Sequence, residues 1–172
     1  MIRAASQTIH VFQGDHQIAD TPGLIMTTIL GSCVTACLFD PDRRIGGMNH
    51  FLLPDAPGVR DIRHASAAME ELINSLLKAG ARRDRLVAKL FGGASMNQAL
   101  PDIGRRNGEA AQKFLKDEGI AVIAKSLGGH QARRVRFWPE SGRAQQLLLQ
   151  DTQEPAATTP RHVTAEATIE LF

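Results

Sequence analysis

A strand–turn–strand pattern over residues 33–53 constrains the fold of this chain more than any other feature. Side chains alternate through 33–39, with Cys, Thr, Cys and Phe pointing one way and Val, Ala and Leu the other, as in a strand. The segment Asp40-Pro41-Asp42-Arg43 has the composition of a type I turn, with Asp first and Pro second. Residues 45–53 then form a second apolar run. The pattern therefore predicts a β-hairpin.

The predicted hairpin brings a thiol and an imidazole together. If Pro41 and Asp42 are the two central residues of the turn, Asp40 pairs with Arg43 and Cys33 lies opposite His50. Directly opposed residues have Cβ atoms roughly 4.5–5.5 Å apart and project to the same face. A loop longer by one residue would put them on opposite faces. We assume the even-numbered loop that the turn composition favours.

A thiol beside an imidazole is suited to nucleophilic catalysis. The pair favours a thiolate–imidazolium form, and the thiolate is the nucleophile. Gly31 and Ser32 precede Cys33, so the chain can turn sharply and N–H groups around Cys33 can face a developing oxyanion. The alternative is that Cys33 is a small buried hydrophobe, as most cysteines in apolar strands are.

Cys37 fits that alternative better, because it lies deeper in the strand with no polar partner suggested. Strand residues four apart are separated by roughly 13 Å, beyond the disulfide limit of about 7 Å. Cys33 and Cys37 are therefore predicted to be two thiols, in keeping with a reducing compartment. The same spacing argues against a thiol redox sensor, and it is poor zinc-site spacing.

The remaining sequence predicts an α+β protein. Helices are expected over 61–79 and from Asn107, a good N-cap, to 118, and a glycine follows each. Further strands are expected over 8–19, 24–30, 86–91, 120–125, 133–138 and 143–149. Strands outnumber helices and the hairpin signals favour antiparallel pairing, so two helices should cover one face of the sheet.

The length of 172 residues fits one domain. We assign that domain to residues 1–150. Thr, Ala, Pro and Gln dominate residues 151–172, which predicts a disordered tail, although its last four residues are apolar enough to dock.

Charge and hydropathy exclude several functions. Twenty basic and 18 acidic residues give a net charge of +2, without the basic excess of a nucleic-acid binder. No stretch approaches the roughly 20 apolar residues needed to cross a bilayer. The N-terminus has no apolar segment typical of a signal peptide. We therefore expect a cytoplasmic protein that neither binds nucleic acid nor inserts into a membrane.

The residues of the hairpin also carry a family pattern. The blocks are Thr27-Thr28-Ile29-Leu30-Gly31-Ser32-Cys33-Val34, Cys37-Leu38-Phe39-Asp40-Pro41 and Gly46-Gly47-Met48-Asn49-His50-Phe51-Leu52-Leu53-Pro54, followed by Lys89-Leu90-Phe91-Gly92-Gly93-Ala94, Ile103-Gly104-Arg105-Arg106-Asn107, Leu127-Gly128-Gly129 and Arg133-Arg134-Val135-Arg136-Phe137. Together they closely resemble the chemoreceptor glutamine deamidase family, CheD, over residues 8–149. Ser126 departs from the pattern, because many relatives carry an acidic residue there.

The resemblance implies both an activity and a site. It implies that Cys33 is the nucleophile, His50 its base and Thr27 the third member, on a layered α/β/β fold. The expected reaction is hydrolysis of glutamine side chains in the cytoplasmic helices of methyl-accepting chemotaxis receptors to glutamate and ammonia, through a Cys thioester. It requires no metal or cofactor. The family also implies a CheC-type response-regulator phosphatase as a partner, so the alternative is a protein that serves chiefly as its activator.

Two further motifs have competing interpretations. Gly92-Gly93 and Gly128-Gly129 lack the spacing of phosphate-binding loops, so close backbone packing near the active site is the favoured interpretation. Arg133, Arg134 and Arg136 are either the solvated face of a strand or a strip that docks acidic receptor helices.

Overall fold

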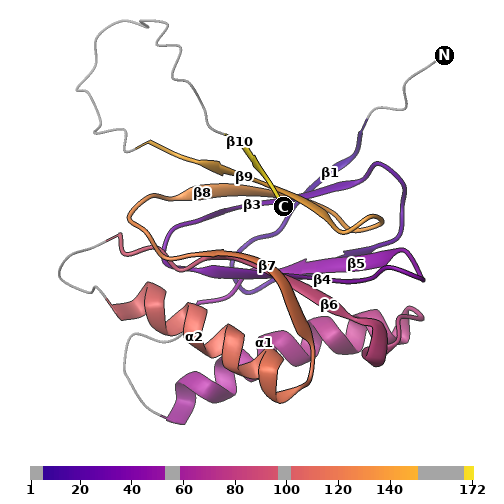
Figure 1. Cartoon of the computed structure of the whole chain (residues 1–172), viewed down its shortest axis with the longest axis horizontal. Helices are drawn as coiled ribbons and strands as arrows, with labels where there is room; N and C mark the ends of the chain where they lie inside the picture. The colour runs from indigo at the N-terminus through magenta and orange to yellow at the C-terminus, as the bar shows by residue number, and fades with distance from the viewer. Residues whose placement is uncertain (1–5, 53–58, 97–101, 151–168) are drawn as a thin grey trace, which may run out of the picture.

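The structure, a computed structural model, describes residues 6–52, 59–96, 102–150 and 169–172. It has three layers: a helical layer, a middle sheet and an outer sheet (Figure 1). The middle sheet contains, in spatial order, β2 (His16–Ala19), β5 (Ile45–Asn49), β4 (Val34–Asp40), β6 (Val87–Gly92) and β7 (Ala121–Leu127). The outer sheet contains β1 (Thr8–His10), β3 (Ile25–Leu30), β8 (Arg133–Trp138), β9 (Arg143–Leu148) and β10 (Ile169–Leu171).

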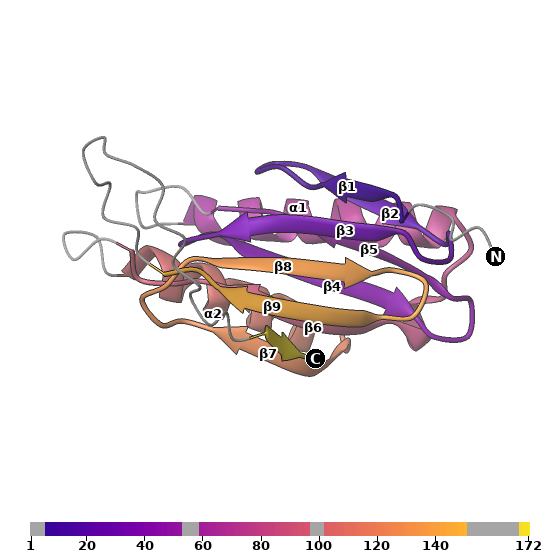
Figure 2. The same cartoon turned by 90° about the horizontal axis from the view of Figure 1, so that it is seen from above.

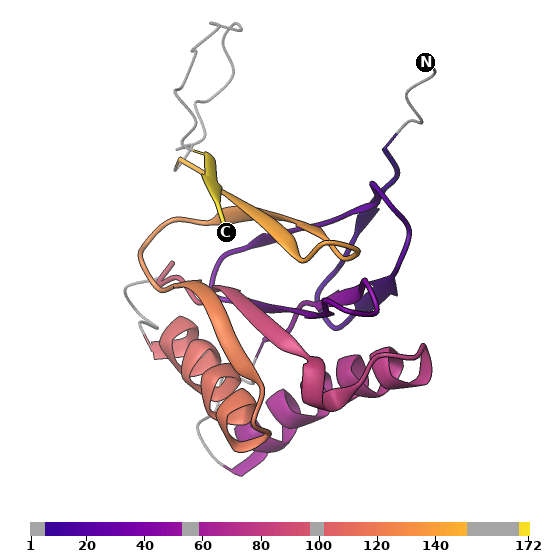
Figure 3. The same cartoon turned by 45° about the vertical axis from the view of Figure 1, so that its right-hand side comes forward.

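Both helices pack on the face of the middle sheet that points away from the outer sheet (Figure 3). They are α1 (Val59–Lys78) and α2 (Asp102–Asp117), and a short 3-10 turn, Arg83–Arg85, leads into β6. Only β1–β3 and β6–β7 pair in parallel among the strand pairs of the described ranges. The predicted α+β class is therefore confirmed, with layered α/β/β order, mostly antiparallel strands and two helices on one face.

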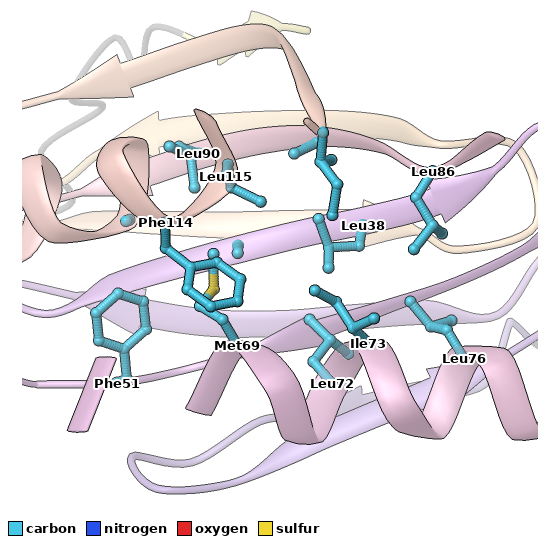
Figure 4. Packing of buried hydrophobic residues seen from close by; sticks show 14 of the residues in the cluster. Leu38, Phe51, Met69, Leu72, Ile73, Leu76, Leu86, Leu90, Phe114 and Leu115 are labelled. Atoms are coloured by element: carbon cyan, nitrogen blue, oxygen red, sulfur yellow. The ribbon is translucent and has the colours of Figure 1, made fainter. Parts of the chain in front are cut away.

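Two hydrophobic cores hold the layers together. One lies between the helices and the middle sheet, where Leu72 and Ile73 of α1 face Leu38, and Leu115 of α2 lies beside Leu90 (Figure 4). The other fills the space between the two sheets (Figure 2 shows the sheets from above) and consists of Val11, Leu24, Met26, Leu30, Cys37, Phe39, Met48, Phe91, Val135, Phe137 and Ala144. Every residue of β4 is buried because this strand is central in the middle sheet and has a core on each face.

The predicted hairpin exists, but its two-residue turn is wrong. Asp40 pairs with Ile45, so the loop contains four residues, 41–44. The Asp40 carboxylate accepts the N–H groups of Asp42 and Arg43, and its carbonyl accepts that of Arg44. Arg44 has φ 54°, a left-handed conformation that closes the longer loop, so that Asp40 pairs with Ile45 instead of Arg43. The even loop length preserves the face of each side chain.

Three other expectations need correction. The single strand predicted over 8–19 is two strands in different sheets, because residues 11–15 make a turn with Gly14 at φ 89°. The second helix begins at Asp102, so Asn107 is not its N-cap but a buried residue inside it. Of the predicted tail, 151–168 lies outside the described residues.

The apolar end of the chain does dock, as its composition suggested. Ile169–Leu171 pairs with β9, and the ring of Phe172 packs edge-on against Phe91 with centroids 5.2 Å apart. In the part of the chain that the structure describes, no helix is both long and apolar enough to cross a bilayer.

Candidate active site

Cys33 lies where the chain crosses from the outer sheet to the middle sheet, between Leu30 of β3 and Val34 of β4. All three carbonyls of this crossing are held. The carbonyl of Gly31 accepts a hydrogen bond from Ala94 N (3.0 Å), and that of Cys33 accepts one from Gly93 N (2.8 Å). The carbonyl of Ser32 accepts one from the side-chain amide of Asn107 (2.7 Å from Nδ2). The N–H groups of Ser32 and Cys33 have no acceptor on another described residue. They are therefore available to an oxyanion.

The first of the two glycine pairs, Gly92-Gly93, supports this crossing by close backbone packing. Gly92 has φ 113°, and a Cβ there would collide with the carbonyl oxygen of Cys33. A Cβ on Gly104 would collide with the carbonyl of Ala94. The second pair joins the first through a 2.9 Å bond from Gly128 N to Gly92 O. The packing interpretation is confirmed for Gly92 but not for Gly128, where an added Cβ would meet nothing within 4 Å.

Cys33 and His50 project to the same side of the middle sheet. Val34 and Phe51 form an antiparallel bridge, with both N–H to O distances 3.0 Å, and their side chains belong to the helix-facing core. Alternation along each strand then turns Cys33 and His50 toward the outer sheet. With Val34 opposite Phe51, Cys33 lies opposite Leu52, so the two residues are diagonal neighbours rather than directly opposed. Diagonal neighbours are roughly 7–8 Å apart, within reach of a long or aromatic side chain.

The imidazole of His50 is held by one ring nitrogen. Its Nδ1 lies 2.8 Å from the hydroxyl of Thr28, and that hydroxyl donates to the carbonyl of Val11 at 2.7 Å. Because the single hydroxyl proton is used on Val11, the oxygen of Thr28 accepts from Nδ1–H. The proton is thereby assigned to Nδ1, which leaves Nε2 with a lone pair. Nε2 is buried and has no hydrogen-bond partner among the described residues.

Burial favours the neutral forms of both groups. It raises the pKa of the Cys33 thiol above its ordinary value, although a bond from the residue's own N–H opposes the shift. It lowers the pKa of His50, against the smaller effects of the Val11 carbonyl and the charge of Asp15. Both directions disfavour the resting thiolate–imidazolium pair expected from sequence. A neutral imidazole with a free Nε2 can instead act as a general base at the moment of attack.

The two adjacent threonines point in different directions. The hydroxyl of Thr27 donates to the carbonyl of Val135 at 2.9 Å, in the neighbouring strand β8. It is Thr28, facing the space between the sheets, that contacts His50. Within the described residues, the contact that orients the imidazole thus comes from Thr28 rather than from Thr27, the residue that the family pattern indicated.

A second loop holds both Cys33 and His50. Gly14 N donates to His50 O at 2.8 Å, and His50 N donates to Asp15 O at 3.1 Å. From this turn, the amide oxygen of Gln13 accepts a long hydrogen bond from the Cys33 thiol, 3.8 Å from Sγ to Oε1. A cavity of about 350 Å³ adjoins the turn and is lined by Gln13, Gly14, Asp15, His16, Asn49, His50, Phe51, Leu52, Ala67, Ala68 and Glu71.

Three residues of the site were not predicted from sequence: Gln13, Thr28 and Asn107. Gln13 and Asn107 lie far from Cys33 along the chain, and only the fold brings them near it. The adjacency of Thr27 and Thr28 was the one available signal, and strand alternation alone does not say which of them faces the site.

The predicted arginine strip separates into two parts. Arg134 and Arg136 are exposed. In the neighbouring strand β3, Ile29 pairs with Arg134 and Thr27 with Arg136. Arg133 is 3% exposed, and its guanidinium donates to the carbonyls of Ser126 and Gly128 and to Gln146 Oε1. The expectation that Arg133 belongs to an exposed strip is wrong, because its side chain ties the end of β7 to β9.

Cys37 is fully buried, and burial raises the pKa of its thiol. Both cysteines are free thiols, as predicted. Across the described ranges, no group of three or more His, Cys, Asp or Glu side chains is placed to hold a metal ion.

Comparison with known proteins identifies relatives over nearly the whole chain. Residues 52–147 match a family model described as CheD chemotactic sensory transduction. A protein of Caulobacter vibrioides called "Probable chemoreceptor glutamine deamidase CheD" is 48% identical over 174 residues, which covers 95% of this chain and 92% of the relative. A Cereibacter sphaeroides protein of the same name is 52% identical over 159 residues, covering 91% and 80% of the two chains.

Among solved structures, the Bacillus licheniformis hypothetical protein YfiH matches with a TM-score of 0.46 and 18% identity, covering 65% of this chain and 50% of that one.

Proposed function

This chain belongs to the CheD family of chemoreceptor glutamine deamidases, and we propose that Cys33 is the nucleophile and His50 the general base with which it converts receptor glutamines to glutamate. The observation that supports this assignment is the state of His50. Its Nδ1 is fixed by Thr28, and its buried Nε2 has no partner among the described residues. A histidine held in this way can accept a thiol proton without first losing another bond.

In the first half of the reaction, Nε2 of His50 takes the proton of the Cys33 thiol as sulfur attacks the carboxamide carbon of the glutamine. The C=O electron pair moves to oxygen, and the N–H groups of Ser32 and Cys33 stabilise the resulting oxyanion. The oxyanion then collapses, the C–N bond breaks, and His50 returns its proton to the leaving nitrogen. Ammonia departs, and a thioester joins the former glutamine to Cys33.

In the second half, Nε2 of His50 takes a proton from water as that water attacks the thioester carbon. The second tetrahedral oxyanion accepts hydrogen bonds from the same N–H groups, and its collapse breaks the C–S bond. His50 returns the proton to the sulfur, so the thiol is restored and glutamate is released. Thr28 holds Nδ1 throughout and stabilises the imidazolium that forms in each half, as the third group of a triad does.

The proposal is tested by co-expressing a chemoreceptor with this protein and measuring the receptor by mass spectrometry. The wild type should produce the mass increase of carboxamide-to-carboxylate conversion at specific glutamines. Cys33→Ala should abolish it, and Cys37→Ala, which alters a buried thiol outside the site, serves as the matched control. Undiminished conversion with Cys33→Ala would end the proposal.

Receptor docking and location are further parts of the proposal. Arg134 and Arg136 are exposed on the outer sheet and are suited to bind acidic residues of a receptor's cytoplasmic helices. We propose that the reaction takes place in the cytoplasm, where those helices would lie. The second candidate function is that the protein serves chiefly as the activator of a CheC-type phosphatase. It predicts that Cys33→Ala preserves the biological effect of the protein, whereas the deamidase proposal predicts its loss.

A further inference from the structure

Three exposed apolar side chains lie on segments that adjoin the crossing that carries Cys33. Six large hydrophobic residues are exposed among those that the structure describes: Phe12, Ile29, Met96, Ile123, Ile169 and Leu171. The first three lie on segments that adjoin the crossing at residues 31–33, and we call these three the apolar rim. The other three lie on β7 and β10.

Each member of the rim is tied to the crossing by a specific contact or by the chain itself. Phe12, which is 67% exposed, precedes Gln13, whose amide contacts Cys33 Sγ. The side chain of Met96 lies over Gly31, with its Cγ 3.1 Å from the position that a Cβ on Gly31 would take. Ile29 is an outward-facing residue of β3, two positions before Gly31, and is 51% exposed.

The local backbone holds the rim in place. Asp15 N donates to Phe12 O at 2.9 Å to close the turn, and His10 stacks on the ring of Phe12 with centroids 6.3 Å apart. Ala94 N donates to Gly31 O and Ser95 N to Gly129 O, which fixes the loop that carries Met96. The rim is therefore displayed rather than left over from an incomplete core.

We propose that the apolar rim binds the apolar side chains that flank the target glutamine on a receptor helix, and thereby selects glutamines with apolar neighbours. This inference rests on the proposed function. A macromolecule that delivers a glutamine to Cys33 must cover the surface around Cys33, and exposed apolar area gains free energy when it is covered. Arg134, paired with Ile29, adds a cationic edge that suits an acidic flank of the same helix.

Helix geometry says which receptor positions the rim contacts. Residues three and four apart lie on one face of a helix, separated by one turn of about 5.4 Å. When a glutamine enters the site, its neighbours three and four positions before and after it therefore face the enzyme. The rim comes from three separate segments, which carry Phe12, Ile29 and Met96, so it can contact more than one of these neighbours.

The test measures kcat/KM for deamidation of a helical receptor fragment. Phe12→Ala and Met96→Ala should each lower it about tenfold, the typical effect of truncating one well-covered apolar contact. Ile123→Ala is the matched control, since Ile123 is 55% exposed but lies on β7 outside the rim, and it should leave kcat/KM unchanged. The rate of Cys33 alkylation by iodoacetamide, which is too small to need the rim, should be the same in all four proteins.

Wild-type kcat/KM in both rim variants would overturn the inference, as would a parallel fall in alkylation, which would place the effect on the nucleophile. As a second measurement, fragments with Lys at the third or fourth position from the glutamine should react more slowly with wild type, and this penalty should shrink in Phe12→Ala. If wild type deamidates no fragment, the proposed function fails. Fragment binding to Cys33→Ala, with and without Phe12→Ala, then tests the rim by itself.

Discussion

Thr28→Val is the most informative single substitution for the proposed mechanism, because it keeps the shape of the side chain and removes only the hydroxyl. The hydroxyl of Thr28 accepts from Nδ1 of His50 at 2.8 Å and donates to Val11 O at 2.7 Å. Without it, the nearest remaining acceptor for Nδ1–H is Val11 O, which is 3.4 Å away. The imidazole then loses its short bond and can rotate or change tautomer.

The magnitude follows from that loss. A buried polar group deprived of its partner costs about 1–3 kcal/mol. The weak contact to Val11 recovers part of this, so we expect about 1–2 kcal/mol of lost transition-state stabilisation, or roughly a 5- to 30-fold fall in kcat/KM.

The assay is ammonia release from a purified receptor fragment, with Thr27→Val as the matched control. Thr27 is equally buried, at 5% exposure, but its hydroxyl donates to Val135 O and has no contact with His50. Thr28→Val should therefore lower kcat/KM more than Thr27→Val does, while thermal unfolding shows that both variants remain folded. The reverse order would refute the assignment of Thr28 as the residue that positions the imidazole.

Four further predictions concern pH, stability and docking. Since burial raises the pKa of Cys33, alkylation of the free enzyme should keep accelerating as the pH rises beyond the thiol's ordinary pKa of 9.0, and a plateau between pH 5 and 8 would indicate a preformed ion pair instead. Since burial lowers the pKa of His50, the acid limb of kcat/KM should lie below its ordinary 6.5; a midpoint above that value would contradict the neutral base. Burial raises the pKa of Asp40, but bonds from Arg85 and from backbone N–H groups outweigh this and lower it from 3.8 to about 2. The resulting stabilisation, roughly 2 kcal/mol, is present above pH 3.8 and lost as the pH falls through about 2. Asp40→Asn should therefore lower the free energy of unfolding in urea at pH 7 and have little effect near pH 2, and equal losses at both would be inconsistent with this origin. Reversing Arg134 and Arg136 to Glu should weaken receptor binding at low salt and have less effect at high salt, because exposed charges are screened. Unchanged affinity at low salt would remove the docking role.

The hairpin and the α+β class could be predicted from the sequence because they depend on alternation and on turn composition, whereas the α/β/β layer order was implied by the family resemblance. The register could not, since it depends on the left-handed conformation of Arg44, a residue that ordinarily avoids positive φ. The prediction that Cys33 and His50 share a face survived because the loop length stayed even.

The other errors arose from residues with more than one ordinary use. Asn107 is a favoured N-cap, but here its side-chain amide is used inside α2 to hold the carbonyl of Ser32. Arg133 resembles its exposed neighbours in sequence, yet alternation along β8 turns it inward. There its guanidinium donates to the carbonyls of Ser126, near the end of β7, and of Gly128, just after it. Gln13 came near Cys33 only through the pairing of β2 with β5.

The most direct test of the central claim is to detect the thioester. A receptor fragment mixed rapidly with the enzyme and quenched in acid should yield a covalent adduct whose mass equals enzyme plus fragment less one ammonia. Peptide mapping should place the adduct on Cys33, and it should be absent from Cys33→Ala and present in Cys37→Ala. An adduct on Cys37, or glutamate formation at the full rate by Cys33→Ala, would contradict the account.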